Sequence, residues 1–389
     1  MPSRRAYTLL GLASAAVMVA VAHAPGEAGG LHTLAVAGLA LVSGSLLAEV
    51  LGVAPAALEL LLGLVAALAG ASPGPLLDGL GLLGSVFIMF MAGVEVDPRY
   101  LRRRLASSLA SGLASFAVPA GVGYLVLSSL GYSGKEALLA SIACSTTSVA
   151  VVYALVRRAG IARSPLGQLV LSSAMVADVA SILAYAAVSG PLGPAAAYLA
   201  ASVVGAIATA RLLAFIAGAP HEAEIRVLLA VLTMMALLGE RLGSHAILFA
   251  FLLGASSRRV LASTPGLEER ISAIVFGLLA PLFFVDAGLH AAPRNPLVYA
   301  ETALLLLAAT LPAKVLATHA ALQATAGRRV PVRLSTVFAA RLTVSTVIAF
   351  SGEAQGILPH DLAGAIIVSA LIATLAAAGV ARALRVEEL

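Results

Sequence analysis

The chain has 389 residues, of which 60% are hydrophobic and only 11% are charged. Because an average soluble domain carries about 25% charged residues, this composition excludes a soluble globular protein and predicts an all-α polytopic membrane protein. The net charge of +5 does not indicate nucleic acid binding, since the basic residues fall in short loops and no basic face carries interleaved aromatic residues. The single cysteine, Cys144, excludes an intrachain disulfide and a cysteine metal cluster.

Fourteen windows of apolar residues are long enough, at about 17–25 residues each, to cross a bilayer as helices. They begin near residues 7, 31, 55, 79, 105, 136, 166, 193, 225, 244, 272, 299, 331 and 361, and the windows at 55 and 244 are the shortest. Glycine and proline separate most of them, as at Gly29-Gly30 and Gly190-Pro191. The connections are too short to hold a soluble domain, so residues 1–389 are predicted to form one transmembrane unit.

The loops between the windows differ in charge. If the windows alternate in direction, nineteen of the 24 lysines and arginines lie in one set of loops, while the other set holds only Lys135, Arg241 and Arg294. By the positive-inside rule, the arginine-rich loops face the cytoplasm. The pattern therefore predicts a multi-pass protein of the cell membrane with both termini in the cytoplasm.

The first window has a second interpretation. Arg4-Arg5, an apolar run and Ala22-His23-Ala24 before Pro25 resemble a secretory signal peptide with its cleavage site. Cleavage would remove the first span and place the new amino terminus outside the cell. We favour a retained helix, because a proline directly after the cleavage site is unfavourable for cleavage.

Three charged residues lie deep within predicted spans. Asp178 is in the apolar stretch 166–189, Lys314 is in the stretch 301–323, and Arg341 lies in a third stretch. A charge at the centre of a bilayer costs roughly 2.5–3.5 kcal/mol even on lenient scales. Because such a cost requires a functional reason, the three residues predict an ion or proton pathway.

Two distant spans repeat a pattern of hydroxyl residues. The segments 143–149 (ACSTTSV) and 340–346 (ARLTVST) place serine and threonine at matching positions in the middle of their spans. One interpretation is ordinary packing, since serine and threonine often lie between transmembrane helices. The other is a pair of broken helices in inverted repeats, whose half-helix ends face an ion at the midplane of the membrane.

Four blocks of sequence resemble a known family. Residues 84–97, GSVFIMFMAGVEVD, are similar to the signature of the second branch of the monovalent cation:proton antiporter superfamily, which comprises the sodium/proton exchangers and the Kef-type potassium systems. Three further blocks agree in order and spacing: Thr146-Thr147-Ser148 followed by 167–171 and Asp178; 243–247 followed by Ala250-Phe251 and Gly254; and 281–285 with Gly288. The resemblance covers about residues 31–383.

The resemblance implies a sodium/proton antiporter fold with inverted repeats, two crossing broken helices, and separate dimerisation and core domains. It implies dimerisation-side helices at about 7–71 and 193–260, and core ion-transport helices at about 79–189 and 272–383. It also implies an elevator-type mechanism and a homodimer in membrane lipid, because in this architecture the mobile core needs a static partner.

Site residues are carried over by position. Asp178 matches the cation-binding and proton-binding aspartate of the family. Thr147 and Ser148 match the first broken helix, Lys314 matches the core lysine, and Arg341 falls in the second crossing helix. The resemblance therefore implies an ion site at Asp178 with the other four residues around it.

The chain departs from the family at Ala177. Electrogenic members carry an aspartate there that pairs with the lysine, so Lys314 loses its expected partner. Asp286, near the outer end of its predicted helix, is either a solvated residue at the mouth of the site or a substitute counter-ion for Lys314 or Arg341. No cluster of histidine, cysteine and glutamate shows metal-ligand spacing, so neither a cofactor nor a metal other than the transported cation is expected.

The function predicted from these residues is secondary antiport. A carboxylate within the membrane can hold a proton, or release it and bind a hard monovalent cation, and one site with two competing ligands is sufficient for exchange. Na⁺ is the expected cation and H⁺ the exchanged ion, with Li⁺ and K⁺ as alternatives, and the sequence leaves open whether exchange moves net charge.

Two other functions agree less well with the sequence. A Kef-type potassium efflux system normally carries a nucleotide-binding domain after its last helix, and none is expected on this chain, which continues only to Leu389. An intramembrane enzyme is not expected, because the sequence contains neither a Gly-x-Gly-Asp pattern nor a His-Glu-x-x-His pattern.

Overall fold

The computed structural model describes residues 4–23, 30–95, 104–158, 160–161, 164–189, 195–218, 222–242, 245–327 and 329–382. Within these ranges all regular structure is helical, and nine helices are long and apolar enough to cross a membrane. The prediction of an all-α polytopic membrane protein is confirmed. Several predicted features lie outside the described residues: the cleavage site at Ala24-Pro25, the motif residues 96–97 and 243–244, and the last residues, 383–389.

Every predicted window coincides with a helix or with an interrupted helical rod. The window at 55 is the short helix α3, which begins at Pro55, where the missing proline N–H costs nothing in the first turn. The window at 244 corresponds to α12, which begins at His245. Among the described helices, crossing length is shown for nine, and for the remaining windows the crossing of the membrane stays a prediction.

Two compact units make up the chain. The first comprises Met1–Val94 and Leu192–Ala292, and the second comprises Glu95–Pro191 and Pro293–Leu389. The expected core segments 79–189 and 272–383 differ from this division, because residues 79–94 and 272–292 group with the first unit. The division follows from contacts alone, so the roles of dimerisation and core remain predictions.

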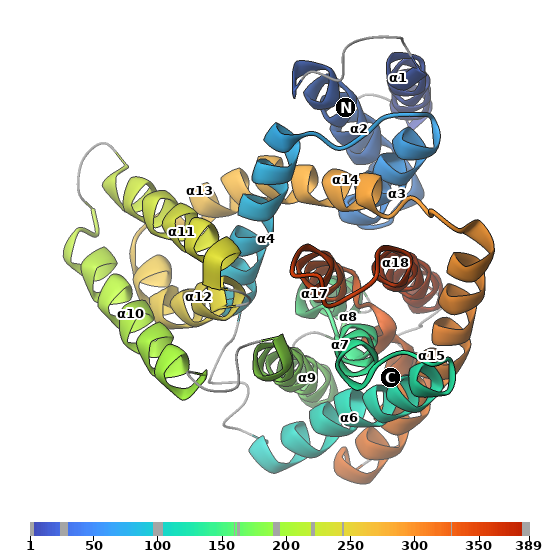
Figure 1. Cartoon of the computed structure of the whole chain (residues 1–389). Helices are drawn as coiled ribbons and strands as arrows, with labels where there is room; N and C mark the ends of the chain where they lie inside the picture. Colours follow the sequence, from blue (N-terminus) through green and yellow to red (C-terminus); the bar gives the residue numbers. More distant parts are fainter. Residues whose placement is uncertain are drawn as a thin grey trace. The chain divides into compact units, whose positions relative to one another are not determined.

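The first unit is built from two groups of helices joined by two long rods, as Figure 1 shows for α1–α3, α10–α12, α4 and α13–α14. Its helices are α1 (Arg4–His23), α2 (Gly30–Leu51), α3 (Pro55–Leu68), α4 (Pro75–Glu95, of which the last residue counts with the second unit), α10 (Ala195–Phe215), α11 (Ala223–Leu242), α12 (His245–Ser263), α13 (Leu267–Ile274) and α14 (Ala280–His290). One apolar core joins α1, α2, α3, α4 and α14, with Met18, Leu77 and Val285 fully buried in it.

Glycine lets α4 approach its neighbours closely. A Cβ added at Gly93 of α4 would clash with the backbone of Phe251 in α12, and one added at Gly254 of α12 would clash with the backbone of Phe90 in α4. Gly81 gives similar room to the side chain of Asp286 in α14. These contacts fix α4 against both α12 and α14, as small residues do between membrane helices.

The rod from α13 to α14 contains a π-helical turn, η1 (Val275–Leu279). The N–H of Ala280 reaches the carbonyl of Val275, five residues back. Pro281 follows and has no N–H to donate, so the wider turn lets the rod continue past the proline. Asp286 lies in the part of the rod beyond this turn.

The second unit gathers α6, α7, α8, α9, α15, α17 and α18, which lie together in Figure 1. Its helices are α6 (Leu105–Ser129), α7 (Gly134–Ser145), α8 (Val149–Arg158), α9 (Pro165–Ser189), α15 (Pro296–Thr325), α16 (Val332–Ser335), the 3₁₀ turn η2 (Thr336–Ala339), α17 (Leu342–Ala354) and α18 (His360–Arg382). A capping box starts α7, in which Ser133 and Glu136 each bond the other's backbone N–H.

Candidate functional site

Two helical rods of the second unit are interrupted at the segments that the hydroxyl pattern predicts. Helix α7 ends at Ser145 and α8 begins at Val149, so residues 146–148 are not helical. In the second rod, η2 ends at Ala339 and α17 begins at Leu342. The prediction of broken helices at 143–149 and 340–346 is therefore confirmed, and plain helix packing does not describe these segments.

The two breaks contact each other. The backbone N–H of Ser148 donates to the carbonyl of Ala340 at 2.7 Å, and the hydroxyls of Ser148 and Thr343 lie 3.2 Å apart. The hydroxyl of Thr147 lies 3.5 Å from the carbonyl of Phe338. Backbone groups that a break leaves without intrahelical partners thus find them across the crossing, as burial requires.

Lys314, in the middle of α15, is buried and holds two carbonyl oxygens. Its Nζ donates to the carbonyl of Ser115 in α6 at 3.0 Å and to the carbonyl of Ser145, the last residue of α7, at 2.8 Å. Ala177, the residue at which the chain departs from the family's pattern, is also buried. Both of these hydrogen bonds from Lys314 thus go to backbone carbonyls.

Arg341, at the second break, is the largest fully buried side chain of the described residues. One guanidinium nitrogen donates to the carbonyl of Cys144 and lies 3.1 Å from the hydroxyl of Thr310, and the other lies 3.2 Å from the hydroxyl of Ser369. Its backbone N–H donates to Thr374 at 3.1 Å. The arginine thus joins the end of α7 to α15 and α18.

The end of α7 is consequently capped by two cations. The last carbonyls of a helix lack intrahelical partners and carry the negative end of the helix dipole. Here the carbonyl of Cys144 accepts from Arg341 and that of Ser145 accepts from Lys314. The hydrogen bonds from these two basic side chains therefore stabilise the point at which α7 stops.

Asp178 lies in α9 and is almost fully buried, with 3% of its surface exposed. Its Oδ1 makes no hydrogen bond with any described residue, so this oxygen is not used for a helix–helix contact. Asp178 and Lys314 interact electrostatically, which brings the carboxylate into the group of buried charges around the breaks. A buried carboxylate oxygen without a donor is an unfavourable arrangement unless a ligand completes it.

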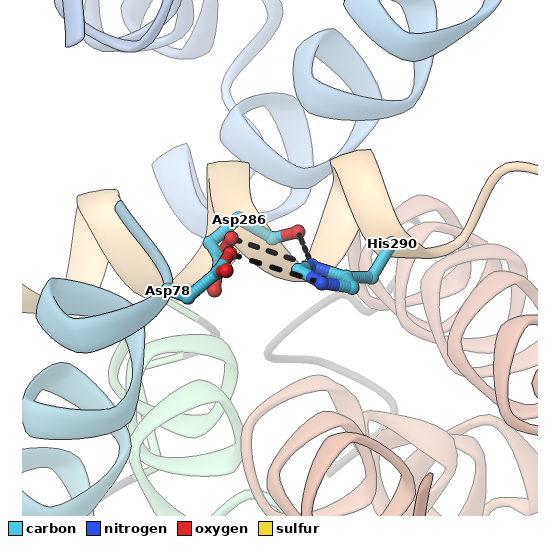
Figure 2. Close-up of side chains that lie close together, drawn as sticks. All are labelled: Asp78, Asp286 and His290. Carbon is cyan, nitrogen blue, oxygen red and sulfur yellow. Dashed lines mark hydrogen bonds and ion pairs between the residues drawn. The ribbon is translucent and has the colours of Figure 1, made fainter. Parts of the chain in front are cut away.

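Asp286 lies elsewhere, in the first unit, where α14 and α4 meet (Figure 2). It is 0% exposed, so the interpretation of a solvated residue at the mouth of the site is wrong. The groups around its carboxylate are His290, four residues along α14, and Asp78 of α4. Sequence reasoning missed both neighbours: the spacing of Asp286 and His290 was a usable signal, but Asp78 is separated from them by about two hundred residues of chain.

Most of the predicted site residues come together in the second unit. Thr147 and Ser148 of the first break contact residues of the second break. Lys314 and Arg341 donate to neighbouring carbonyls at the end of α7, those of Ser145 and Cys144. Asp178 is coupled to Lys314 electrostatically. Two contacting broken helices next to a buried carboxylate and buried cations define the chain as a multi-pass membrane protein of the secondary-transporter type.

The chain belongs to the sodium/hydrogen exchanger family. The family described as "Sodium/hydrogen exchanger, transmembrane" matches residues 36–385, which is nearly the whole chain. This match confirms the resemblance seen over residues 31–383.

Named relatives and a solved structure agree with this assignment. The chain is 26% identical over 221 residues to a probable Na⁺/H⁺ antiporter 3 of Methanocaldococcus jannaschii, covering 53% of this chain and 57% of that protein. It is 30% identical over 236 residues to cation/H⁺ antiporter 18 of Arabidopsis thaliana, covering 55% and 29% respectively. The chain thus spans little more than half the length of the first relative and less of the second.

The fold matches the structure of the sodium proton antiporter MjNhaP1 from Methanocaldococcus jannaschii with a TM-score of 0.66. The alignment covers 91% of this chain and 99% of that one, at 18% sequence identity. The shared fold is therefore that of this sodium proton antiporter, and the relatives are named as transporters rather than enzymes.

Proposed function

We propose that the protein is a secondary antiporter that exchanges a monovalent cation, Na⁺, for H⁺ across the cell membrane. The observation that carries this proposal is Asp178, a buried carboxylate whose Oδ1 has no hydrogen-bond partner among the described residues, coupled electrostatically to Lys314 at the broken helices. The names of the relatives, Na⁺/H⁺ and cation/H⁺ antiporters, support the same chemistry.

The chemistry follows from competition at one carboxylate. A carboxylate oxygen is a suitable ligand for a hard monovalent cation, and the same oxygen accepts a proton. The carboxylate holds either the cation or the proton, but not both at once. If the loaded site faces each side of the membrane in turn, the cation moving down its gradient in one direction drives the proton in the opposite direction. Thr147 and Ser148 are proposed to supply further oxygen atoms from the first break.

Alternating access is proposed to involve the unit that holds the breaks. Both broken helices, Asp178 and Lys314 all belong to the second unit. In transporters with inverted repeats, access to a midplane site usually changes by largely rigid-body movement of one bundle against another. The second unit is therefore the proposed mobile core of an elevator-type mechanism, with both termini in the cytoplasm by the distribution of arginine.

The protein is expected to be a homodimer, because a moving core requires a static partner within the membrane. Helices of the first unit, including residues 7–71 and 193–260, are proposed to form the interface. The expected result is a mass of about twice the chain's 39.0 kDa, measured by native mass spectrometry from lipid nanodiscs. A fully active preparation that contains monomers alone would refute the dimer.

Lys314 determines whether transport moves net charge. If both Asp178 and Lys314 exchange protons, two protons move for each cation, so one positive charge is unbalanced and transport is electrogenic. Moving that charge across the membrane involves about 2.3 kcal/mol per 100 mV of membrane potential. If Lys314 stays charged on the carbonyls of Ser115 and Ser145, one proton balances one cation. We propose the electrogenic case, because lysine, unlike arginine, can release its proton in a protein.

Ion exchange in proteoliposomes under clamped voltage tests both proposals. We expect Na⁺ on one side to drive H⁺ to the other, and we expect an imposed potential at equal ion gradients to drive net Na⁺ movement. Li⁺ and K⁺ are tested in the same vesicles, and empty vesicles give the background. Exchange of K⁺ without Na⁺ would assign the chain to the potassium alternative. If the imposed potential drives no net Na⁺ movement, exchange is electroneutral and Lys314 has a purely structural role.

A further inference from the structure

Three potential metal-binding side chains meet in the first unit, outside the proposed ion site. Asp78 lies near the start of α4, and Asp286 and His290 lie one turn apart near the end of α14 (Figure 2). One ligand atom from each residue can be chosen so that all three lie within 4.8 Å of one another. Nε2 of His290 is 3.8 Å from Oδ1 of Asp78, and Nδ1 is 3.3 Å from Oδ1 of Asp286.

Asp286 is the least satisfied member of this cluster. Its side chain is 0% exposed, and neither carboxylate oxygen makes a hydrogen bond with any described residue. The nearest positive group is His290, whose Nδ1 forms an ion pair with Oδ1 at 3.3 Å. The carboxylate occupies the space left by Gly81 of α4, where any Cβ would clash with it, and it points toward Asp78 and His290 in Figure 2. Two carboxylates side by side repel each other unless a positive group lies between them.

The two ring nitrogens of His290 face different groups of the cluster. Its Nδ1 lies 3.0 Å from the backbone carbonyl of Asp286, so a proton on Nδ1 is donated to that oxygen. In the neutral tautomer that has its proton on Nδ1, the lone pair is on Nε2, the ring nitrogen that lies 3.8 Å from Oδ1 of Asp78. Metal-binding histidines are typically held in this way, with the other ring nitrogen donating to a carbonyl or carboxylate.

We propose that Asp78, Asp286 and His290 form a binding site for a divalent transition metal ion of the zinc type. Two carboxylates and one imidazole nitrogen suit such ions. Zinc bonds of about 2.0–2.2 Å to oxygen and nitrogen place ligand atoms up to about 4 Å apart. The ligand atoms here lie within 4.8 Å of one another, so the three side chains need to move together only slightly to bind an ion.

The shape of the site fits an exchangeable ion. The side chain of Asp78 is 44% exposed and that of His290 is 25% exposed, while Asp286 is enclosed. An ion can therefore enter from the side of Asp78 and His290 and reach Asp286 last. Three protein ligands leave a fourth position for water, as in open zinc sites. The bound ion would join α4 to α14, and this proposal does not depend on the antiport proposal.

The test is titration of the purified, tag-free full chain with Co²⁺ and Zn²⁺. We expect about one Co²⁺ per chain, visible as d–d absorption that Zn²⁺ displaces, and a rise in the thermal unfolding temperature with Zn²⁺. In Asp286→Asn and His290→Gln, we expect the affinity to fall at least tenfold and the Zn²⁺-dependent rise to disappear. Asp78→Asn is expected to weaken binding as well.

The matched control is His360→Gln. His360 also pairs with a carboxylate, through Nδ1 and Oε1 of Glu353 at 2.6 Å, but it lies in the second unit and belongs to no group of three potential metal ligands among the described residues. We expect this variant to bind Co²⁺ like the wild type. Asp286→Asn is nearly isosteric, and a far-UV circular dichroism spectrum like that of the wild type checks that the metal-free variant is folded.

Two outcomes would overturn the metal site. One is a wild-type chain that binds neither Co²⁺ nor Zn²⁺ at a single site, which would make the cluster an ion pair between an imidazolium and two carboxylates. The other is binding that survives unchanged in both Asp286→Asn and His290→Gln. Neither outcome alters the expected Na⁺/H⁺ exchange, so the two proposals fail separately.

Discussion

Replacing Asp178 with asparagine is expected to reduce Na⁺/H⁺ exchange to the level of empty vesicles. The amide cannot carry the negative charge that binds a cation, and it cannot take up and release a proton, so both halves of the exchange are lost together. The measurement is Na⁺-driven proton movement in proteoliposomes that contain equal amounts of wild-type and variant protein.

The same substitution should leave the fold intact. Asparagine has nearly the same shape as aspartate, and the hydrogen bond from Ser181 goes to the backbone carbonyl of Asp178, which the variant keeps. Glu301→Gln is the matched control, because Glu301 is an exposed carboxylate on α15 in the same unit. Wild-type exchange rates in Asp178→Asn would remove the central claim, whereas we expect Glu301→Gln to exchange normally.

Replacing Arg341 with alanine is expected to destabilise the protein by about 3–5 kcal/mol, since it opens a cavity and leaves a buried carbonyl without a donor. The carbonyl in question belongs to Cys144, at the end of α7. Thr310 and Ser369 keep hydrogen bonds to backbone carbonyls of their own helices, so they contribute less to the loss. The unfolding temperature should therefore fall by several degrees.

Cys144 offers a direct readout of this effect. It is the only cysteine of the chain and is fully buried, so a thiol-reactive dye labels it only when the surrounding structure opens. The chain has no tryptophan, so tryptophan fluorescence cannot follow its unfolding. Far-UV circular dichroism provides the independent measurement of the unfolding temperature. The control is Arg333→Ala, an exposed arginine of α16. Equal unfolding temperatures for the two variants would contradict the role of Arg341 at the break.

Local chemistry explains why much of this fold could be predicted from sequence. A long apolar segment that crosses a bilayer forms a helix, because every backbone N–H and C=O group must make its hydrogen bond within the segment. Breaks in such helices need nearby polar side chains, so the hydroxyl residues at 146–148 and 343 indicate both crossings in the sequence alone. Asp178 stands out for the same reason, as a charge whose burial demands an explanation.

What could not be predicted depends on contacts between distant residues. The partners of Lys314 are backbone carbonyls, which every residue has, so no sequence signal identifies Ser115 and Ser145 as its acceptors. Asp286 was expected near solvent because it lies close to a helix end, but the absence of a side chain at Gly81 gives its carboxylate a buried position. The division of the chain into units likewise follows from packing, which is why residues 79–94 group differently from the expectation.

The two cations at the end of α7 also have a mechanical consequence. Through them the break is tied to four other helical elements: Lys314 links α15 with α6, and Arg341 links the start of α17 with α18. Shifting α7 alone would strip donors from buried carbonyls, at a cost of about 1–3 kcal/mol for each one left unpaired. We therefore expect α7 to move together with α6, α15, α17 and α18 as one rigid body, because such a movement keeps these hydrogen bonds and costs the least free energy.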